Sequence, residues 1–130
     1  MKNQIIQYRR ERATETLDDA RILYDAGKLL SAANRVYYAL FYEVIALLLL
    51  FDLSSPKHSG VRALLNQKFV KTGKISVSNS RFYSEMFEFR HKADYADIPV
   101  ISPEMFEGVF ESAERFIANC EQVISENTVN

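Results

Sequence analysis

A chain of 130 residues in which 48% are hydrophobic and 25% are charged has the composition of one globular domain, residues 1–130, rather than of a disordered segment. Its single cysteine, Cys120, excludes a disulfide framework and a cysteine-based metal cluster. The formal net charge is −1, and residues 1–15 are polar and mixed in charge, unlike a signal peptide, so we expect a cytoplasmic protein.

The charge is unevenly distributed along the chain. Residues 53–84 contain no acidic residue, whereas residues 94–126 are rich in acidic residues and contain one base, Arg115. This asymmetry is consistent with an anionic ligand on the basic side, with antiparallel self-association of complementary patches, or with a solvated surface that has no partner. The basic side chains of residues 53–84 are Lys57, Arg62, Lys68, Lys71, Lys74 and Arg81.

Residues 3–26 have the spacing of a first amphipathic helix. Its apolar face repeats at intervals of three and four residues. Gly27 is expected to end this helix, because glycine adopts the left-handed conformation without a steric penalty from a Cβ atom. The face consists of Ala13, Leu17, Ala20 and Tyr24.

Residues 30–51 are predicted to form a second helix that is apolar on almost every side. Its apolar run, residues 36–51, is shorter than the roughly 20 residues that cross a bilayer and contains Glu43, so a buried central helix fits better than a membrane span. An unpaired buried carboxylate is costly, and we therefore expect Glu43 to contact Arg90 or an arginine of the first helix.

Residues 53–60 contain a proline and a glycine and are predicted to form a turn, followed by a short third helix over residues 59–70. Lys57 and His58 then lie at the start of a helix, where backbone N–H groups favour anions. The alternative for His58 is a turn residue that hydrogen-bonds its own backbone.

Residues 82–96 are predicted to form a fourth helix, after a polar connection over residues 74–79. This helix has two stripes at helical spacing, one that faces the core and one that is mixed. Arg90 lies on the mixed stripe, and its simplest role is a solvated ion pair with Asp94 one turn later. The expected core stripe is Phe82, Met86, Phe89 and Ala93, and the mixed stripe is Tyr83, Phe87, Arg90 and Asp94.

The last predicted helix begins with Ser102 as its N-cap and Pro103 at its first position, and apolar residues keep helical spacing as far as Ile124. No strand pattern appears anywhere in the sequence. The chain is therefore predicted to be all-α: an up-and-down four-helix bundle with an additional short helix, in which sequential helices are antiparallel.

The residues that could carry chemistry point to an anion-binding site. The two histidines, His58 and His91, lack metal-binding spacing, and none of the four glycines belongs to a phosphate-binding loop, so we expect no metal and no cofactor. Arg90 is a permanent cation whose planar group suits phosphate, and His91 can donate or accept a hydrogen bond near neutral pH. His91 could equally be an exposed polar residue of the helix.

Four segments of the sequence, in this order, resemble the HEPN domain family. The similarity extends over about residues 13–123 and is strongest to small stand-alone bacterial and archaeal HEPN proteins. The four segments are NRVYYALF at residues 34–41, KHSGV at 57–61, FVKTG at 69–73 and RHKADY at 90–95.

This resemblance implies a helical bundle that is usually a symmetric homodimer. It also implies frequent genomic pairing with a minimal nucleotidyltransferase, as toxin and antitoxin. Many members are metal-independent ribonucleases whose site, at the dimer interface, combines an arginine with a histidine about four to six residues later. Arg90 matches the family arginine, and His91 matches the polar residue that follows it.

The sequence departs from this pattern, because no histidine occurs at positions 95, 96 or 97. Tyr95 is a poor substitute, since an unperturbed tyrosine has a pKa near 10 and is a weak base at neutral pH. His91 follows Arg90 directly and points about 100° around the helix. His58 could reach the same cleft from the turn before the third helix. The ribonuclease motif is therefore degenerate.

Three functions follow from these observations. The first is a non-catalytic or weakly catalytic HEPN protein that binds a nucleotide, RNA or a nucleotidyltransferase partner through a dimeric cleft. The second is an active ribonuclease toxin in which His91 or His58 replaces the missing histidine. The third is a helical interaction module in which Arg90 pairs with Asp94 or Glu43.

Each residue of the candidate site has a predicted role. Arg90 would bind phosphate, and it is the catalytic candidate together with His91. His91 and Asn34 would add hydrogen bonds, and Tyr38 or Tyr95 would stack on a base. The full predicted anion-binding set is Arg90, His91, Asn34, Tyr38, Tyr95, Lys57 and His58.

Overall fold

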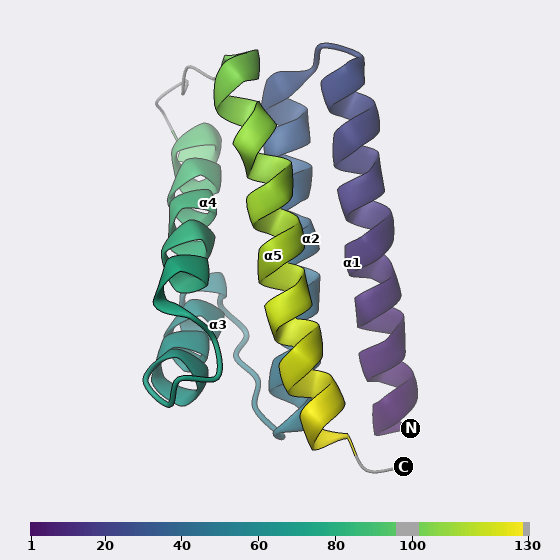
Figure 1. The fold of residues 1–130 in the computed structure, drawn as a ribbon, viewed down its shortest axis with the longest axis vertical. Helices are drawn as coiled ribbons and strands as arrows, with labels where there is room; N and C mark the ends of the chain where they lie inside the picture. The colour runs from purple at the N-terminus through teal and green to yellow at the C-terminus, as the bar shows by residue number, and fades with distance from the viewer. Residues whose placement is uncertain (96–101, 129–130) are drawn as a thin grey trace.

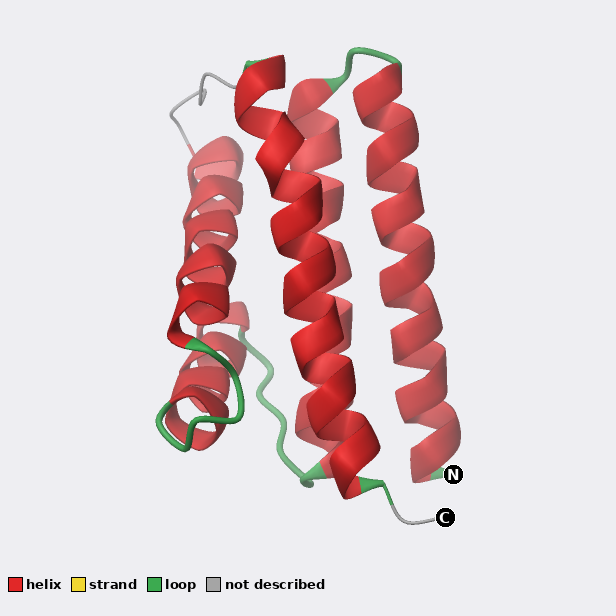
Figure 2. Ribbon diagram, viewed as in Figure 1, coloured by secondary structure: helices red, strands yellow, loops and turns green. Residues whose placement is uncertain are grey.

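The computed structural model describes residues 1–95 and 102–128, and of residues 93–95 it describes the backbone but not the side chains. Every regular element in these residues is helical (Figure 2). The all-α prediction, with four long helices and a shorter one, is therefore confirmed. The elements are α1 Lys2–Asp25, α2 Leu29–Leu50, α3 His58–Leu65, the π-helical turn η1 Asn66–Val70, α4 Val77–Tyr95 and α5 Pro103–Asn127.

α2 is the central helix of the bundle. It lies behind α5 in the view of Figure 1, between α1 and α4, and it contacts α1, α3, α4 and α5. The connection from α1 to α2 is short because Gly27 adopts a φ of +80° at the end of α1, as the sequence predicts. α1 and α2 therefore pack side by side along their full length (Figure 1).

The hydrophobic core is built mainly from α2 and α5. Half of α2 is fully buried, which follows from its apolar sequence on almost every side. By length and composition this helix could cross a membrane, but 56% of its apolar window is buried inside the bundle, as in a core helix. The buried side chains of α5 are Phe106, Phe110, Ala113, Phe116, Cys120, Val123 and Ile124.

Glu43 is fully buried in the middle of α2, and of the arginines expected near it, Arg10 of α1 acts on the carboxyl through its charge but does not hydrogen-bond it. Neither of its carboxylate oxygens has a hydrogen-bond partner among the described residues. Burial, and to a smaller extent the negative charge of Glu121, raises the pKa of Glu43 to about 8, while the positive charge of Arg10 opposes the rise. Arg90 lies elsewhere, so the expected Arg90–Glu43 contact is wrong.

α4 differs from the prediction in its start and in its buried face. It begins at Val77 rather than at residue 82, because the Ser76 hydroxyl accepts a hydrogen bond from the Asn79 N–H at 3.1 Å and caps the helix. The fully buried aromatic residue is Tyr83, which was assigned to the mixed stripe, whereas Phe82 and Phe89 are half-buried. Tyr83 is buried because its ring stacks on Phe116 of α5, with the ring centres 5.4 Å apart.

The remaining boundaries agree with the sequence to within a few residues. The Ser102 hydroxyl accepts a hydrogen bond from the Met105 N–H at 3.2 Å, which confirms the predicted N-cap of α5. The predicted third helix is present but is divided into α3 and η1. Ala93 and Asp94 lie where the side chains are not described, and residues 98–99, the predicted end of the fourth helix, lie outside the described residues.

Candidate functional site

Arg90 lies near the end of α4 and packs against two tyrosines of α2. Its Nε donates a hydrogen bond to the Tyr38 hydroxyl at 3.2 Å. The guanidinium carbon lies 5.5 Å from the ring centre of Tyr37 and 5.6 Å from that of Tyr38, within the range of cation–π attraction. Arg90 is half-buried, so its cation is held in one place by aromatic neighbours rather than extended into solvent.

His58 reaches the same pair of tyrosines from the first position of α3. Its Nδ1 lies 2.7 Å from the Tyr37 hydroxyl, a hydrogen-bond distance, and its ring stacks on Phe41 with centres 4.3 Å apart. The ring of Tyr38 approaches it edge-on at 5.9 Å. Because stacking and a hydrogen bond act together, the imidazole orientation is fixed.

Tyr37 links the arginine and the histidine and is itself fully buried. Burial raises the pKa of Tyr37 to about 12, although the positive charge of Arg90 opposes the rise. The hydroxyl therefore stays protonated at neutral pH and serves as a neutral hydrogen-bonding group for His58.

The first turns of α2 add a second arginine to this cluster. Arg35 donates a hydrogen bond to the Asn34 side-chain oxygen at 2.8 Å, and its guanidinium carbon lies 4.9 Å from the ring centre of Tyr38. Tyr38 thus has the guanidinium groups of Arg35 and Arg90 beside one ring. We call Arg35, Tyr37, Tyr38, His58 and Arg90 the Arg90 cluster.

Arg35 and Tyr37 were missed as site residues by the sequence analysis, although both lie in the NRVYYALF segment. A signal for Arg35 was present: it is the only cation of an otherwise apolar helix and precedes Tyr38 by three positions, so both share one face. Tyr37 carried no such signal, because a buried tyrosine in an apolar helix looks like core.

Comparison with known proteins assigns the chain to a family. A family model described as the HEPN domain matches residues 6–123, which is most of the sequence. This chain belongs to the HEPN domain family. The resemblance seen in the four sequence segments is therefore confirmed.

Individual relatives cover almost the whole chain. A UPF0332 protein from Thermotoga maritima is 46% identical over 125 residues, which span 96% of this chain and 95% of the relative. Two proteins from Methanocaldococcus jannaschii carry the name "Putative toxin". One is 31% identical and covers 90% of this chain and 80% of its own length, and the other is 34% identical and covers 89% and 86%.

Three predicted site residues remain, and the structure describes the side chains of two of them. Lys57 precedes α3 and its side chain is exposed, next to His58 in sequence. His91 is exposed on α4, on a different side of the helix from Arg90. The side chain of Tyr95 lies outside the described residues.

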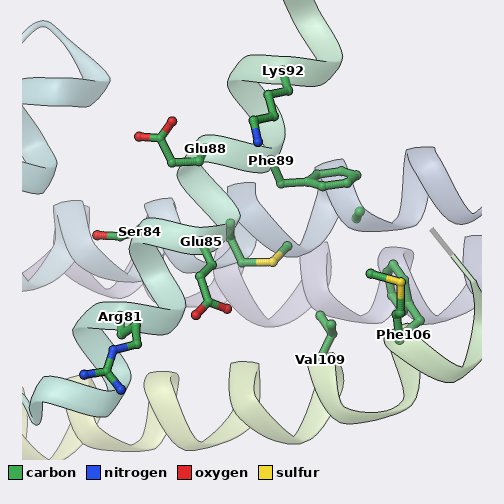
Figure 3. A pocket seen from close by; sticks show the side chains of 11 residues that line it. Arg81, Ser84, Glu85, Glu88, Phe89, Lys92, Phe106 and Val109 are labelled. Carbon is green, nitrogen blue, oxygen red and sulfur yellow. The ribbon is translucent and has the colours of Figure 1, made fainter. Parts of the chain in front are cut away.

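A cavity of about 670 Å³ between helices of the HEPN bundle is lined by none of the residues of the Arg90 cluster. It lies between α4 and α5: Phe89 and charged side chains line it from α4, and Phe106 and Val109 line it from α5 (Figure 3). No group of three or more potential metal ligands occurs among the residues that the structure describes. The Arg90 cluster brings two guanidinium groups, an imidazole and two phenol rings together.

Proposed function

We propose that this HEPN protein binds RNA at the Arg90 cluster and acts as a toxin-like protein. The observation that carries the proposal is the position of the Arg90 guanidinium, held between two tyrosine rings and bonded to the Tyr38 hydroxyl. A guanidinium matches the oxygens of a phosphate group, and a half-buried tyrosine beside it offers a surface for a base. Two relatives named "Putative toxin" support the toxin-like role.

A homodimer is part of this proposal. HEPN proteins are usually symmetric dimers by the resemblance described above, and a dimer would place two Arg90 clusters in one assembly. Sedimentation velocity of the purified protein at several concentrations measures its oligomeric state. A monomer at all concentrations would contradict the proposed homodimer.

The Arg90→Ala variant tests the binding site. We expect its affinity for a fluorescent single-stranded 2′-O-methyl RNA octamer to fall by about 10- to 100-fold, because a hydrogen bond to a charged group contributes about 1.5–3 kcal/mol. Fluorescence anisotropy at fixed salt measures the dissociation constant, since such affinities depend on salt.

Arg81→Ala is the matched control for this experiment. Arg81 is an exposed arginine of the same helix that lies away from Tyr38, so its removal changes the net charge equally. The dissociation constant of Arg81→Ala for RNA should lie within about threefold of the wild-type value, because salt screens the attraction between a distant cation and the ligand. Absence of binding by the wild type, or equal affinity of the wild type and Arg90→Ala, would falsify the proposal.

Cleavage of RNA is a second candidate function, and the position of His58 favours it. His58 is held against the tyrosines that contact Arg90, so an imidazole is present although the family spacing lacks one. In this reaction the RNA 2′-oxygen attacks the adjacent phosphorus and the 5′-oxygen leaves. His58 would take the 2′-hydroxyl proton and return it to the leaving oxygen.

We expect His58→Gln to lose cleavage of unmodified RNA and to keep its affinity for the 2′-O-methyl octamer. The loss should be about 100-fold or more, as for removal of a general acid–base group. Gel analysis of products with 2′,3′-cyclic phosphate and 5′-hydroxyl ends measures the rate, and His91→Gln serves as the control. No cleavage by the wild type, or loss only in His91→Gln, refutes this candidate and leaves the binding proposal standing.

A further inference from the structure

One row of side chains along α2 is half-exposed, although between its two ends the helix is buried on its other sides. The row repeats at intervals of three and four residues and so follows one face of the helix. It lies between α1 and α4, since Arg12 of α1 contacts Tyr42 and Arg90 of α4 contacts Tyr38. Its members are Asn34, Arg35, Tyr38, Phe41, Tyr42, Ile45 and Leu49.

Cations and aromatic rings alternate along the part of this row that is nearer the N-terminus of α2. The guanidinium carbon of Arg12 lies 5.3 Å from the ring centre of Tyr42, and that ring lies 6.3 Å from the ring of Tyr38. Tyr38 in turn contacts the guanidinium groups of Arg35 and Arg90. We call Arg12, Tyr42, Tyr38, Arg35 and Arg90 the cation–aromatic strip; it joins α1, α2 and α4.

Positive groups interleaved with half-exposed aromatic rings fit a single nucleic-acid strand. Proteins that hold such strands combine cations along the backbone with aromatic side chains on which successive bases stack. The separation of 6.3 Å between the rings of Tyr38 and Tyr42 exceeds the spacing of about 3.4 Å between neighbouring bases in one strand of a duplex. The two rings therefore suit bases that have been drawn apart, as on a protein surface.

Arg12 is available to such a ligand in spite of its acidic neighbour. It forms an ion pair with Glu15 at 3.4 Å, three residues later on α1, and the Glu15 side chain is 66% exposed. Exposed pairs of this kind contribute little to stability and are screened by salt. A phosphate that approaches the strip can therefore draw Arg12 away from Glu15.

We infer that Arg12 and Tyr42 form a second nucleotide position beside the one at Arg90 and Tyr38, and that the ligand is a single RNA strand occupying both. This inference rests on the proposed function and adds to it the extent of the ligand. The strand lies along α2, with its backbone near Arg90 at one position and near Arg12 at the other. A mononucleotide fills only the first position.

The test compares a short and a longer ligand. Uridine 5′-monophosphate is titrated by NMR, and a fluorescent 2′-O-methyl tetrauridylate, which cannot be cut through its 2′-oxygen, is titrated by anisotropy. We expect the wild type to bind the tetranucleotide more tightly by on the order of tenfold or more, as stacking of one further base provides. Tyr42→Ala should lose this gain and keep its affinity for the mononucleotide, whereas Tyr42→Phe should keep both.

Arg12→Ala provides an independent measurement. The slope of log affinity against log salt for the tetranucleotide should become shallower by about 0.7, the value for one phosphate contact with a single strand. Arg21→Ala is the matched control, because Arg21 also lies on α1, stacks on a ring and forms a surface ion pair, but outside the strip. It should keep the wild-type slope.

The outcomes separate this inference from the function on which it rests. If the wild type binds neither ligand, or if Arg90→Ala binds both like the wild type, the proposed function fails and the inference fails with it. If the mononucleotide and the tetranucleotide bind equally well, or if Tyr42→Ala weakens both equally, the second position does not exist while binding at Arg90 stands. An equal change of slope in Arg12→Ala and Arg21→Ala also overturns the second position.

Discussion

Replacing Glu43 by glutamine is expected to stabilise the protein at pH 8 by on the order of 4 kcal/mol, and at pH 5 by less than about 1 kcal/mol. Glu43 is fully buried in α2, and its carboxylate oxygens have no hydrogen-bond partner among the described residues. Glutamine has nearly the same shape as a protonated glutamic acid but cannot ionise. The variant therefore isolates the cost of the buried negative charge.

The direction of the effect follows from the two states of the chain. Burial raises the pKa of Glu43 from 4.5 to about 8 in the folded protein, so the folded state holds the proton more tightly than the unfolded state. The resulting stabilisation is complete below about pH 4.5. It is lost as the pH rises from there through about 8, because the unfolded chain then gains by ionising.

Urea denaturation at pH 5, 6.5 and 8 measures this difference as a change in the free energy of unfolding. The charged groups that face Glu43 are Arg10 of α1 and Glu121 of α5, and both remain in the variant. Glu126→Gln, an exposed change on α5, is the control and should follow the wild type at each pH. Parallel curves for the wild type and Glu43→Gln would show that the carboxyl is not a buried acid.

The Phe116→Ala variant is expected to lose about 3–5 kcal/mol of unfolding free energy. Phe116 is fully buried on α5, and its ring stacks on Tyr83 of α4 with centres 5.4 Å apart. Truncation removes the apolar transfer energy of the ring and leaves a cavity between two helices. Tyr83 also lies 6.0 Å from Tyr37, so the lost packing is directly beneath the Arg90 cluster.

The shift of the denaturation midpoint measures the loss of unfolding free energy, provided that the slope of this free energy against denaturant concentration is unchanged. Phe116→Leu is the matched control because it keeps most of the apolar volume. Phe116→Leu should cost roughly 1–2 kcal/mol, since a volume change in a packed core is felt even when the residue stays apolar. A loss below about 1 kcal/mol in Phe116→Ala would contradict the importance of the Tyr83–Phe116 stack, because core cavities of that size cost more.

Helix positions were predictable because helical periodicity is a local property of the chain. The stripe from Phe106 to Ile124 and the apolar sequence of residues 30–51 each required a helix with a buried face, and both are buried in α5 and α2. The helix ends were equally local: Gly27 has the positive φ that it was expected to adopt at the end of α1, and Ser102 caps the start of α5. These features depend on neighbours within one or two turns.

The burial of α4 could not be predicted, because two of its faces carry aromatic residues. The spacing of Phe82, Met86 and Phe89 and the spacing of Tyr83 and Phe87 both fit a helix. Phe116 decides between them, since it offers Tyr83 a stacking partner across the bundle. Because Phe116 lies 33 positions after Tyr83 in the chain, no pattern within α4 could have indicated this contact.

The candidate site shows the same division. The sequence indicated Arg90, His58 and Tyr38 as candidates, but no spacing rule showed which of them touch, because they lie on three different helices. The turn before α3 carries His58 to Tyr37, and the packing of α4 against α2 carries Arg90 to Tyr38. Arg12 and Tyr42, on neighbouring helices, were not associated with the site by the sequence at all.

By itself the sequence determined the helices, their caps, the central place of α2 and the membership in the HEPN family, since each depends on residue order and short-range spacing. Only the tertiary structure decided which face of α4 is buried, where the Glu43 carboxyl lies and which side chains surround Arg90. Contacts between residues far apart in the chain depend on how helices pack, and packing is a property of the whole bundle rather than of any one segment.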